Sequence, residues 1–416
     1  MRKYKKLLGM ILAASLAGAS LAGCGGSSGG SQESAENTGS ESAGSSQADV
    51  KAPGNEESAA ENPGNSAAEA GASGAAEGDT RIVVDHTGRE IEIPAQIDRI
   101  VISSILPLPS VYCLFEGSAE KLVGIHPSSM AAAQNSILPK VVPDIVDVNT
   151  DFLQGDEINV EELLKLDPDV VFYSADNTAE YEKLTAAGIP AVGFSTSNWD
   201  YDCVATFENW VKLLGEVLQQ QDKAAGIADY GYEVYDEIQT VLNEAGDDLE
   251  RPKALILFHY GEGTMRTSGS NFFGQYWLDS TGAVNVAESL SGTPEINMEQ
   301  VYEWNPDIIY ITNFSSYLPE DLYSNTIEGD DWSPVKAVQE GQVYKFPLGM
   351  YRWFPPASDT PLVLKWLAQK NQPELFADID MEQEVRDYYE RFYNVSLTDE
   401  DVNQIFHPAR EAAGGN

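Results

Sequence analysis

The chain has 416 residues and a formal net charge of −41 at pH 7, from 66 acidic residues against 25 lysines and arginines. Binding to a nucleic-acid backbone needs a concentrated basic surface, so this charge excludes nucleic acid as an expected partner. The length is sufficient for two domains of ordinary size.

Residues 1–24 have the layout of a secretory signal. Four basic residues among the first six positions precede an apolar run at 7–19, which is shorter than the ~20 residues that span a bilayer. Leu21, Ala22 and Gly23 then precede Cys24, an order that resembles the lipobox of bacterial lipoproteins. The resemblance implies cleavage before Cys24, acylation of that residue, and anchoring at the extracytoplasmic face of the cell membrane.

Residues 25–80 have the composition of a flexible tether. The segment consists largely of Gly, Ser, Ala, Asn, Gln and Glu, with ten acidic residues, one lysine and no aromatic residue. It cannot bury enough apolar surface to offset the entropy of ordering, so we expect it to be disordered. A flexible chain of this length reaches roughly 40 Å.

From residue 81 onward the pattern predicts two α/β lobes, at 81–202 and 247–416. A unit at 157–173 recurs without gaps at 295–311. The positions that match include Glu157 and Glu295, Asn159 and Asn297, Glu161 and Glu299, Pro168 and Pro306, and Asp169 and Asp307. In each copy a possible Asn N-cap precedes apolar residues at helical spacing, a Pro-containing turn and a β-branched run. This order predicts a helix, a turn and a buried strand in each of two similar lobes.

Short apolar runs predict the other strands. They lie at 100–102, 122–125, 170–173 and 191–194 in the first lobe, and at 254–258, 308–311 and 343–346 in the second. Residues 203–246 contain no proline and carry apolar residues at helical spacing, which predicts one interlobe helix of roughly 60 Å. Gly226 and Gly231 are the positions at which this helix would bend or divide. Residues 380–401 are expected to form a packed terminal helix.

Residues 81–406 resemble the substrate-binding lipoproteins of ABC importers, in the branch that handles iron-siderophores, haem and cobalamin. The resemblance rests on a hairpin at 83–94 with a Thr87-Gly88 turn, the repeated unit, the segment 203–246 and the closing segment 392–400. It implies an α/β fold of two similar lobes joined by a long rigid backbone helix, with a ligand cleft between the lobes. It also implies that the chain is not an enzyme, has no cofactor, and delivers an iron-siderophore or similar metal chelate to an ABC permease dimer.

Candidate ligand-binding residues follow the expected strands, because ligands of open α/β sheets bind beyond the carboxyl ends of the strands. These residues are Ser104, Tyr173, His259, Tyr260, Asn313, Tyr351, Arg352 and Trp353. Arg352 is the strongest of them, because a guanidinium binds carboxylate or catecholate oxygens bidentately while flanking aromatic faces stack on a chelator. The alternative is that the flanking aromatic residues pack beneath the loop and Arg352 pairs with an acid.

No spacing in the sequence marks a set of metal ligands. An isolated histidine is more often a structural residue than a ligand, so we expect no metal site made of protein side chains. The alternative is iron ligation by a side chain, for which Tyr351 and His259 are the candidates. Apart from Cys24 the cysteines are Cys113 and Cys203, which match no disulfide framework. These two cysteines either form one disulfide bridge or remain as two buried thiols, and we expect the buried thiols.

Glu161 and Glu299 are the candidate permease-docking residues. In the family that the chain resembles, a glutamate of each lobe docks on a basic pocket of the permease dimer. The repeat supplies one carboxylate per lobe at equivalent positions, which suits a two-fold partner. Alternatives are Glu162 in place of Glu161, the pair Glu157 and Glu295, or simple solvated helix carboxylates.

Other functions remain open at this stage. An enzyme would need a convergent cluster of histidines and carboxylates, a Gly-x-Ser-x-Gly elbow, a Walker loop or a dinucleotide fingerprint, and the sequence contains none of these. Two alternatives keep the same fold: a binding protein for a free metal ion or oxyanion, and a ligand sensor or adhesin that serves no transporter.

Overall fold

The structure is a computed structural model that describes residues 80–413 except for 156, 247 and 262. All of the described residues belong to one compact unit. The expected signal peptide, the expected lipidation residue Cys24 and residues 25–79 of the expected tether lie outside the described residues.

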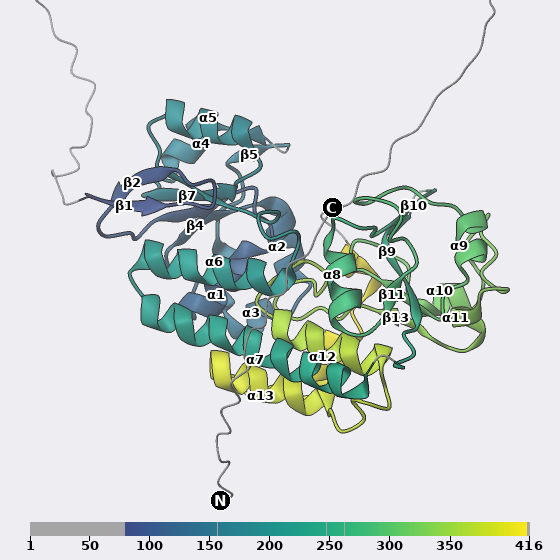
Figure 1. Cartoon of the computed structure of the whole chain (residues 1–416). Coiled ribbons are helices and arrows are strands. Elements are labelled where there is room, and N and C mark those ends of the chain that lie inside the picture. The colour runs from purple at the N-terminus through teal and green to yellow at the C-terminus, as the bar shows by residue number, and fades with distance from the viewer. Residues whose placement is uncertain (1–79, 156, 247, 262, 414–416) are drawn as a thin grey trace, which may run out of the picture. The chain divides into compact units, whose positions relative to one another are not determined.

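An antiparallel hairpin opens the described part of the chain (Figure 1). In it β1 (Thr80–Val84) pairs with β2 (Glu90–Pro94). Asp85 Oδ1 accepts a hydrogen bond from Thr87 N–H at 2.9 Å, and Gly88 has a φ of +80°, a conformation that favours glycine. The turn therefore lies at the Thr-Gly pair, as the sequence predicts.

The first lobe is built on a parallel sheet with the strand order β4-β3-β7-β8. Its strands are β3 (Ile100–Ile102), β4 (Leu122–Ile125), β7 (Val170–Ser174) and β8 (Ala191–Phe194). They are almost wholly buried, as is usual for a parallel sheet with helices on both faces. The other elements of this lobe are α1 (Leu108–Glu116), α2 (Pro127–Gln134), α3 (Leu138–Val141), η1 (Pro143–Asp147), β5 (Leu153–Gln154), β6 (Glu157–Ile158), α4 (Val160–Lys165) and α5 (Thr178–Ala186).

The second lobe has a mixed sheet with the order β10-β9-β12-β13. Parallel strands β9 (Lys253–Gly261), β12 (Ile308–Ile311) and β13 (Val343–Lys345) correspond to the predicted runs. The antiparallel β10 (Thr264–Thr267) and the short β11 (Val284–Asn285) both pair with β9 and are not among the predicted strands. The helices of this lobe are α8 (Phe273–Ser280), α9 (Met298–Trp304), α10 (Pro319–Tyr323), α11 (Lys336–Gln339), α12 (Thr360–Asn371), α13 (Met381–Tyr393), α14 (Asp399–Phe406) and η2 (Arg410–Ala413).

Two helices, not one, occupy residues 203–246. They are α6 (Cys203–Leu218) and α7 (Gln221–Ala245), and they pack against each other. The chain reverses at Gln219, which adopts a left-handed conformation with a φ of +56°. A Cβ on Gly215 would lie 2.6 Å from Cβ of Ala224, so the close approach of the two helices requires glycine at that position.

The segment predicted as one interlobe helix, with a bend or division at Gly226 or Gly231, is divided, but the division lies at Gln219 and at neither glycine. The long backbone helix is α7 alone. It packs against α1 and α6 of the first lobe and against α8 and α12 of the second, so it joins both lobes (Figure 1).

The repeated unit has the same structure in both lobes. α4 begins at the N-cap Asn159 and α9 at the N-cap Asn297, and each Asn side chain accepts hydrogen bonds from backbone N–H groups of its helix. The turns that follow contain Asp167 with a φ of 45° and Asn305 with a φ of 41°, and lead into β7 and β12. The predicted helix, turn and strand are confirmed in each copy.

The aspartate that follows the proline of each repeat also has an equivalent contact. Asp169 Oδ2 accepts hydrogen bonds from the backbone N–H groups of Asp98 at 2.7 Å and Arg99 at 2.8 Å. Asp307 Oδ2 accepts a hydrogen bond from the N–H of Lys253 at 2.7 Å. Both carboxylates thus fix the start of the neighbouring strand, which explains an acidic residue at this position of the repeat.

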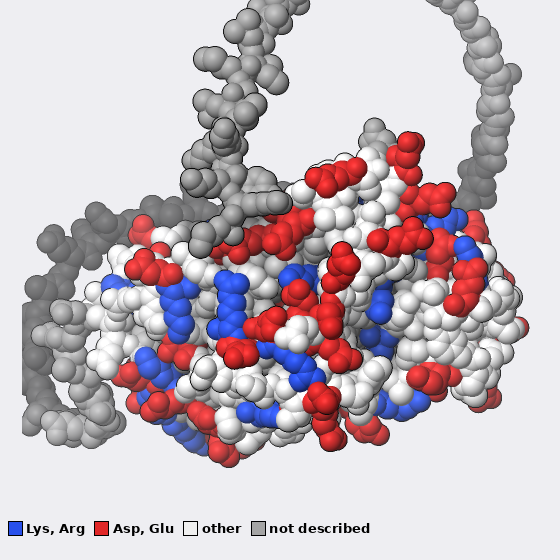
Figure 2. Space-filling model, turned by 90° about the horizontal axis from the view of Figure 1, so that it is seen from below, with Lys and Arg blue, Asp and Glu red and all other residues white. Residues whose placement is uncertain are grey.

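Charged side chains of both signs are interspersed on the face that lies at the bottom of Figure 1, where α7, α12 and α13 are found (Figure 2). Acidic side chains are spread across this face with basic ones between them. The face therefore presents no continuous basic surface of the kind that binds nucleic acid.

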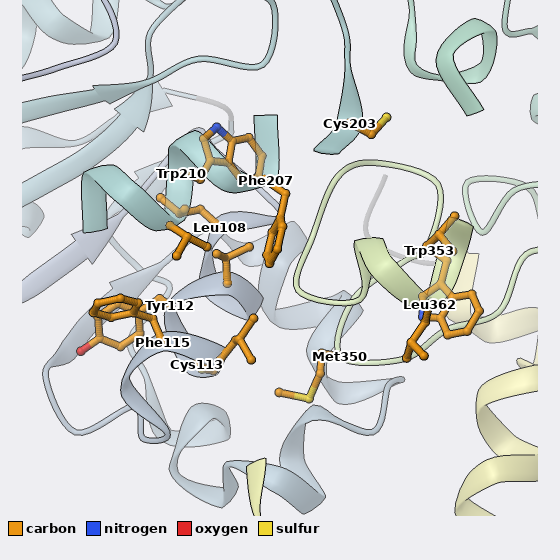
Figure 3. Close-up of a cluster of buried hydrophobic side chains, with 14 of the residues drawn as sticks. Leu108, Tyr112, Cys113, Phe115, Cys203, Phe207, Trp210, Met350, Trp353 and Leu362 are labelled. Carbon is orange, nitrogen blue, oxygen red and sulfur yellow. The ribbon is translucent and has the colours of Figure 1, made fainter. Parts of the chain in front are cut away.

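One buried hydrophobic cluster contains residues of both lobes and of α6 and α7. Figure 3 shows Phe207 and Trp210 of α6 near the buried side chains of α1. Cys113 and Cys203 are free and buried, and burial raises the pKa of each thiol. The expectation of two buried thiols is therefore confirmed.

Candidate functional site

A cavity of about 850 Å³, here called the cleft, lies between the two lobes. Its lining comes from segments at or near the carboxyl ends of strands, where open α/β sheets bind ligands. The described lining residues are Ser104, Leu106, His126, Ser128 and Asn177 of the first lobe, and Phe258, His259, Gly261, Thr264, Arg266, Glu295, Phe314 and Arg352 of the second. The predicted interlobe cleft is present.

Basic and hydrogen-bond-donating groups dominate the polar lining of the cleft. Arg266 and Arg352 supply guanidinium groups and His126 and His259 supply imidazoles, whereas Glu295 is the carboxylate among the described lining residues. The side chain of Arg352 is 1% exposed, and burial lowers the pKa of its guanidinium. A cation held away from water interacts strongly with an anion. The cleft therefore favours a ligand that carries negative charge.

The two histidines differ in the ring nitrogen that carries the proton. His126 Nδ1 accepts a hydrogen bond from Ser128 N–H at 3.0 Å and caps α2, so the neutral ring is protonated on Nε2. His259 Nδ1 lies 3.0 Å from the carbonyl oxygen of Phe314, which only accepts, so this ring is protonated on Nδ1. Among the described residues, no group of three or more His, Cys, Asp or Glu side chains is placed to hold a metal ion.

A second cavity of about 310 Å³, here called the aromatic pocket, adjoins the cleft and shares part of its lining, including Phe258 and Phe314. Most of its other large side chains are aromatic: Tyr201, Trp210, Phe272, Phe273, Tyr351 and Phe354. The ring centroid of Phe258 lies 5.1 Å from that of Phe314 and 5.4 Å from that of Phe272. Such surfaces suit the flat or ring-containing part of an organic ligand.

A buried carboxylate holds the loop that carries Arg352. Asp359 Oδ2 accepts hydrogen bonds from Met350 N–H at 2.7 Å and from Trp353 Nε1–H at 3.0 Å. A Cβ on Gly349 would lie 1.9 Å from the same oxygen, so only glycine allows this approach. The position of the guanidinium in the cleft therefore depends on an acid that does not line the cleft.

A lysine holds the neighbouring loop, which carries Phe314. Lys345 Nζ donates hydrogen bonds to the carbonyl oxygens of Thr312 at 2.9 Å, Ser315 at 2.5 Å and Tyr317 at 3.0 Å. Burial lowers the pKa of Lys345 to about 7. Three carbonyl acceptors match the three donors of an ammonium group, so this side chain fixes the course of the loop.

Four of the predicted ligand residues lie at the site. Ser104, His259 and Arg352 line the cleft, and Tyr351 lines the aromatic pocket. Ser104 Oγ accepts a hydrogen bond from Ser174 N–H at 2.9 Å, which holds the ends of β3 and β7 together. The guanidinium carbon of Arg352 lies 4.5 Å from the ring centroid of Phe314, an aromatic neighbour outside its own loop.

Trp353 and Tyr260 are structural residues and line neither cavity. Trp353 is completely buried, donates its indole N–H to Asp359, and lies near Leu362 in the core (Figure 3). Tyr260 donates its hydroxyl to a carboxylate oxygen of Asp330 at 2.5 Å, inside the core of the second lobe. The prediction of ligand contact is not supported for these two residues, because buried protein partners hold their polar atoms: Asp359 for Trp353 and Asp330, seventy residues away, for Tyr260.

Tyr173 and Asn313 are likewise buried away from both cavities. The Tyr173 hydroxyl accepts a hydrogen bond from Arg89 Nη1 at 3.0 Å, which ties the hairpin to the first sheet. Asn313 Nδ2 donates hydrogen bonds to the carbonyl oxygens of Phe346 at 2.9 Å and Pro347 at 3.0 Å. Both side chains fix backbone near the cleft, and the prediction of direct ligand contact is not supported for them.

The predicted set of ligand residues omits several side chains that line the cleft. Thr264 and Arg266 belong to β10, which is too short to show a clear alternating pattern. The sequence signal for β10 is a pair of glycines, Gly261 and Gly263, at the turn that follows β9. Gly263 has a φ of +77°. Glu295 opens the second repeat, and its place at the cleft depends on the backbone bridge between Arg266 and Glu295.

The predicted docking residues lie on equivalent helices. Glu161 is the second residue of α4, Glu299 is the second residue of α9, and both are exposed. Glu157 is exposed and pairs with Lys183 at 2.6 Å, whereas Glu295 lines the cleft. The alternative pair Glu157 and Glu295 is therefore not equivalent in its surroundings.

A model of the periplasmic binding protein family matches residues 111–348, which is more than half of the chain. The chain belongs to the periplasmic binding protein family. Its relatives include an ABC transporter substrate-binding lipoprotein of Bacillus subtilis, 22% identical over 263 residues. This periplasmic binding protein is therefore a solute-binding component of an ABC transporter, acts outside the cytoplasm, and is not an enzyme.

Similar proteins differ in the solutes that their names state. The molybdate-binding protein MolA of Haemophilus influenzae is 23% identical over 336 residues, which are 76% of this chain and 92% of that protein. The iron-uptake system-binding protein of Bacillus subtilis is 27% identical over 278 residues, which are 63% and 78%. A solved periplasmic solute binding protein from Veillonella parvula has a TM-score of 0.71 and 33% identity, covering 79% of this chain and 97% of that one.

Within the described residues, none of the helices combines the length and the apolar character that crossing a membrane requires.

Proposed function

We propose that this protein captures an anionic metal chelate, such as a ferric siderophore complex, and delivers it to the permease of an ABC importer. The observation that carries the proposal is a cleft containing Arg266 and Arg352 that adjoins an aromatic pocket. Guanidinium groups bind carboxylate or catecholate oxygens bidentately, and aromatic faces bind the organic part of a chelator. A cleft of about 850 Å³ has the volume of sites for organic ligands of this size.

Two relatives support a ferric ligand. Besides the iron-uptake protein described above, a Fe(3+)-citrate-binding protein of Bacillus subtilis is 22% identical over 270 residues. Citrate and catecholate complexes of ferric iron are anionic, which matches a cleft with two arginines. Haem fits the same description, because its propionates are anionic and its macrocycle is flat.

A free oxyanion such as molybdate is the second candidate ligand. The specific observation in its favour is the number of small donors in the cleft, because the hydroxyls of Ser104, Ser128 and Thr264 lie in the same lining as Arg266 and Arg352. Such donors bind a tetrahedral oxyanion through hydrogen bonds. The molybdate-binding relative from Haemophilus influenzae supports this candidate. An oxyanion makes no use of the aromatic pocket, which is why the chelate is preferred.

The proposal includes an anchor and a docking surface. An acylated Cys24 would hold the protein at the outer face of the membrane, and residues 25–79 would act as its tether. Glu161 and Glu299 would dock on basic sites of the permease dimer, one from each lobe. In a Cys24→Ser variant, we expect the protein to move from the membrane fraction to the soluble fraction of a cell lysate.

Titration of tryptophan fluorescence tests the choice of ligand. The purified protein is titrated with ferric citrate, a ferric catecholate, haem, cobalamin, a nickel–histidine complex and molybdate. We expect saturable quenching by an anionic ferric chelate or haem at micromolar or lower concentration, and at least about tenfold weaker binding in Arg352→Ala. Arg251→Ala is the matched control, because Arg251 is exposed and remote from the cleft lining.

Each outcome of the titration decides between the candidates. Saturation by molybdate alone would replace the chelate by the oxyanion. Binding that is equal in the Arg352→Ala and Arg251→Ala variants would reject the cleft as the binding site. If no compound in the set binds, the proposed ligand class is wrong.

A further inference from the structure

Exposed apolar side chains lie at equivalent positions on the two lobes. Leu164 of α4 is 50% exposed and Tyr302 of α9 is 41% exposed. The two residues occupy the same position of the repeated unit, because both helices begin at matching asparagine N-caps. Each lobe thus presents a large apolar side chain to solvent at the same place.

Each of these side chains lies one helical turn after a proposed docking glutamate. Leu164 follows Glu161 by three residues, and Tyr302 follows Glu299 by three residues. Residues three apart on a helix are neighbours on one face. Each lobe therefore presents one pair of such neighbours, Glu161 with Leu164 and Glu299 with Tyr302. Figure 1 shows α4 and α9 on different lobes.

The core of each lobe does not require a large apolar side chain at these two positions. The residues just before them, Leu163 and Val301, are completely buried and supply the core contacts of α4 and α9. Tyr302 donates its hydroxyl to the carbonyl oxygen of Asp331 at 2.6 Å, which fixes the ring on the surface. Glu161 lies three residues before Leu164 and Glu299 three residues before Tyr302, so each surface combines a carboxylate with a large apolar side chain.

We propose that Leu164 and Tyr302 are binding contacts of the permease-docking surface, and that each inserts into an apolar recess beside the basic group that receives the neighbouring glutamate. This inference rests on the docking role proposed above for Glu161 and Glu299. The partner it fits is a two-fold-related membrane protein that presents, at each of two sites, an arginine or lysine next to an apolar recess.

Charged groups and apolar side chains contribute differently to binding at such an interface. Attraction between exposed carboxylates and basic groups steers association and orients the complex, but salt screens it. Burial of an apolar side chain adds affinity that salt does not screen. The large negative charge of the chain attracts any basic surface, in many orientations. The apolar contacts form in the docked orientation alone, so they would favour that orientation over the others.

The test measures binding of the protein, loaded with the compound that saturates it in the titration above, to nanodiscs that hold its cognate permease–ATPase complex. Leu164→Ala and Tyr302→Ala are compared with Glu161→Gln and Glu299→Gln at about 0.05 M and about 1 M salt. Leu375→Ala and Tyr232→Ala are matched controls, because Leu375 is 37% exposed and Tyr232 is 36% exposed at other places on the surface. Circular dichroism and ligand affinity of each variant are measured to establish that it folds.

We expect each apolar variant to bind roughly tenfold more weakly than the unmodified protein at both salt concentrations. The glutamine variants should bind more weakly at low salt, with a smaller effect at high salt, and the controls should be unchanged. Weaker binding of the glutamine variants with normal binding of both alanine variants would overturn this inference and leave the docking role in place. Normal binding of all four variants would refute the docking role itself.

Discussion

The carboxyl group of Asp359 is expected to make the stability of this protein depend on pH in an unusual direction. The side chain is completely buried, and its hydrogen-bond donors are neutral: Met350 N–H, Trp353 Nε1–H and, at 3.4 Å from Oδ2, the Tyr389 hydroxyl. Burial raises the pKa of Asp359 from 3.8 to about 6, although these hydrogen bonds act to lower it. The folded protein therefore binds this proton more tightly than the unfolded chain does.

The sign and the magnitude of the effect of pH on the free energy of unfolding follow from the linkage between folding and proton binding. Because the folded pKa is the higher one, the contribution of this group to stability is complete below pH 3.8 and is lost as pH rises through 6. A shift of about two pKa units at 1.36 kcal/mol per unit corresponds to about 3 kcal/mol. The ionised Asp359 thus costs the native state about 3 kcal/mol at neutral pH.

The substitution Asp359→Asn isolates this effect. The amide keeps a carbonyl oxygen that accepts hydrogen bonds from Met350 and Trp353, but it stays neutral at every pH. The free energy of unfolding is measured by urea denaturation, followed by far-UV circular dichroism, for the unmodified protein and the variant between pH 4 and pH 8. We expect the free energy of unfolding of the variant, relative to that of the unmodified protein, to rise by about 2 kcal/mol as pH rises from 4 to 7.

The control is Asp378→Asn, which neutralises an exposed aspartate on the same lobe. The difference in free energy of unfolding between this control and the unmodified protein should change little over the same pH range. If the curves of Asp359→Asn and the unmodified protein are parallel from pH 4 to pH 7, the carboxyl of Asp359 does not have a raised pKa and the reasoning is refuted.

Three further outcomes are expected. Gly349→Ala should destabilise the protein by about 3 kcal/mol in urea denaturation, because the new Cβ would lie 1.9 Å from Asp359 Oδ2. Gly226→Ala, in an exposed stretch of α7 with nothing within 4 Å of the new Cβ, should instead stabilise it by about 1 kcal/mol, and an equal loss in both variants would contradict the argument. Cys113 and Cys203 should react with a thiol reagent at least about a hundredfold more slowly in the native protein than in urea, and rapid native labelling would mean that they are accessible.

Local hydrogen bonding explains why much of the fold is predictable from sequence. The N-caps Asn159 and Asn297 bond to their own helices, and the Thr87-Gly88 turn closes within its own hairpin. These contacts involve residues close together in the chain, so composition and spacing reveal them. The division of 203–246 at Gln219 is different, because no residue type that favours a left-handed conformation marks it.

For the site, the sequence determines the chemistry available at the strand ends, and the tertiary structure decides which side chains line the cleft. His259 lines the cleft, whereas the adjacent Tyr260 is held in the core by Asp330. Arg352 lines the cleft, whereas the adjacent Trp353 is held by Asp359. Neighbouring residues of a strand such as β9 point to opposite sides, and the side that becomes buried depends on how the lobe packs. Spacing along the chain does not reveal that Tyr260 meets Asp330, because these residues lie seventy positions apart and come together only when the second lobe folds.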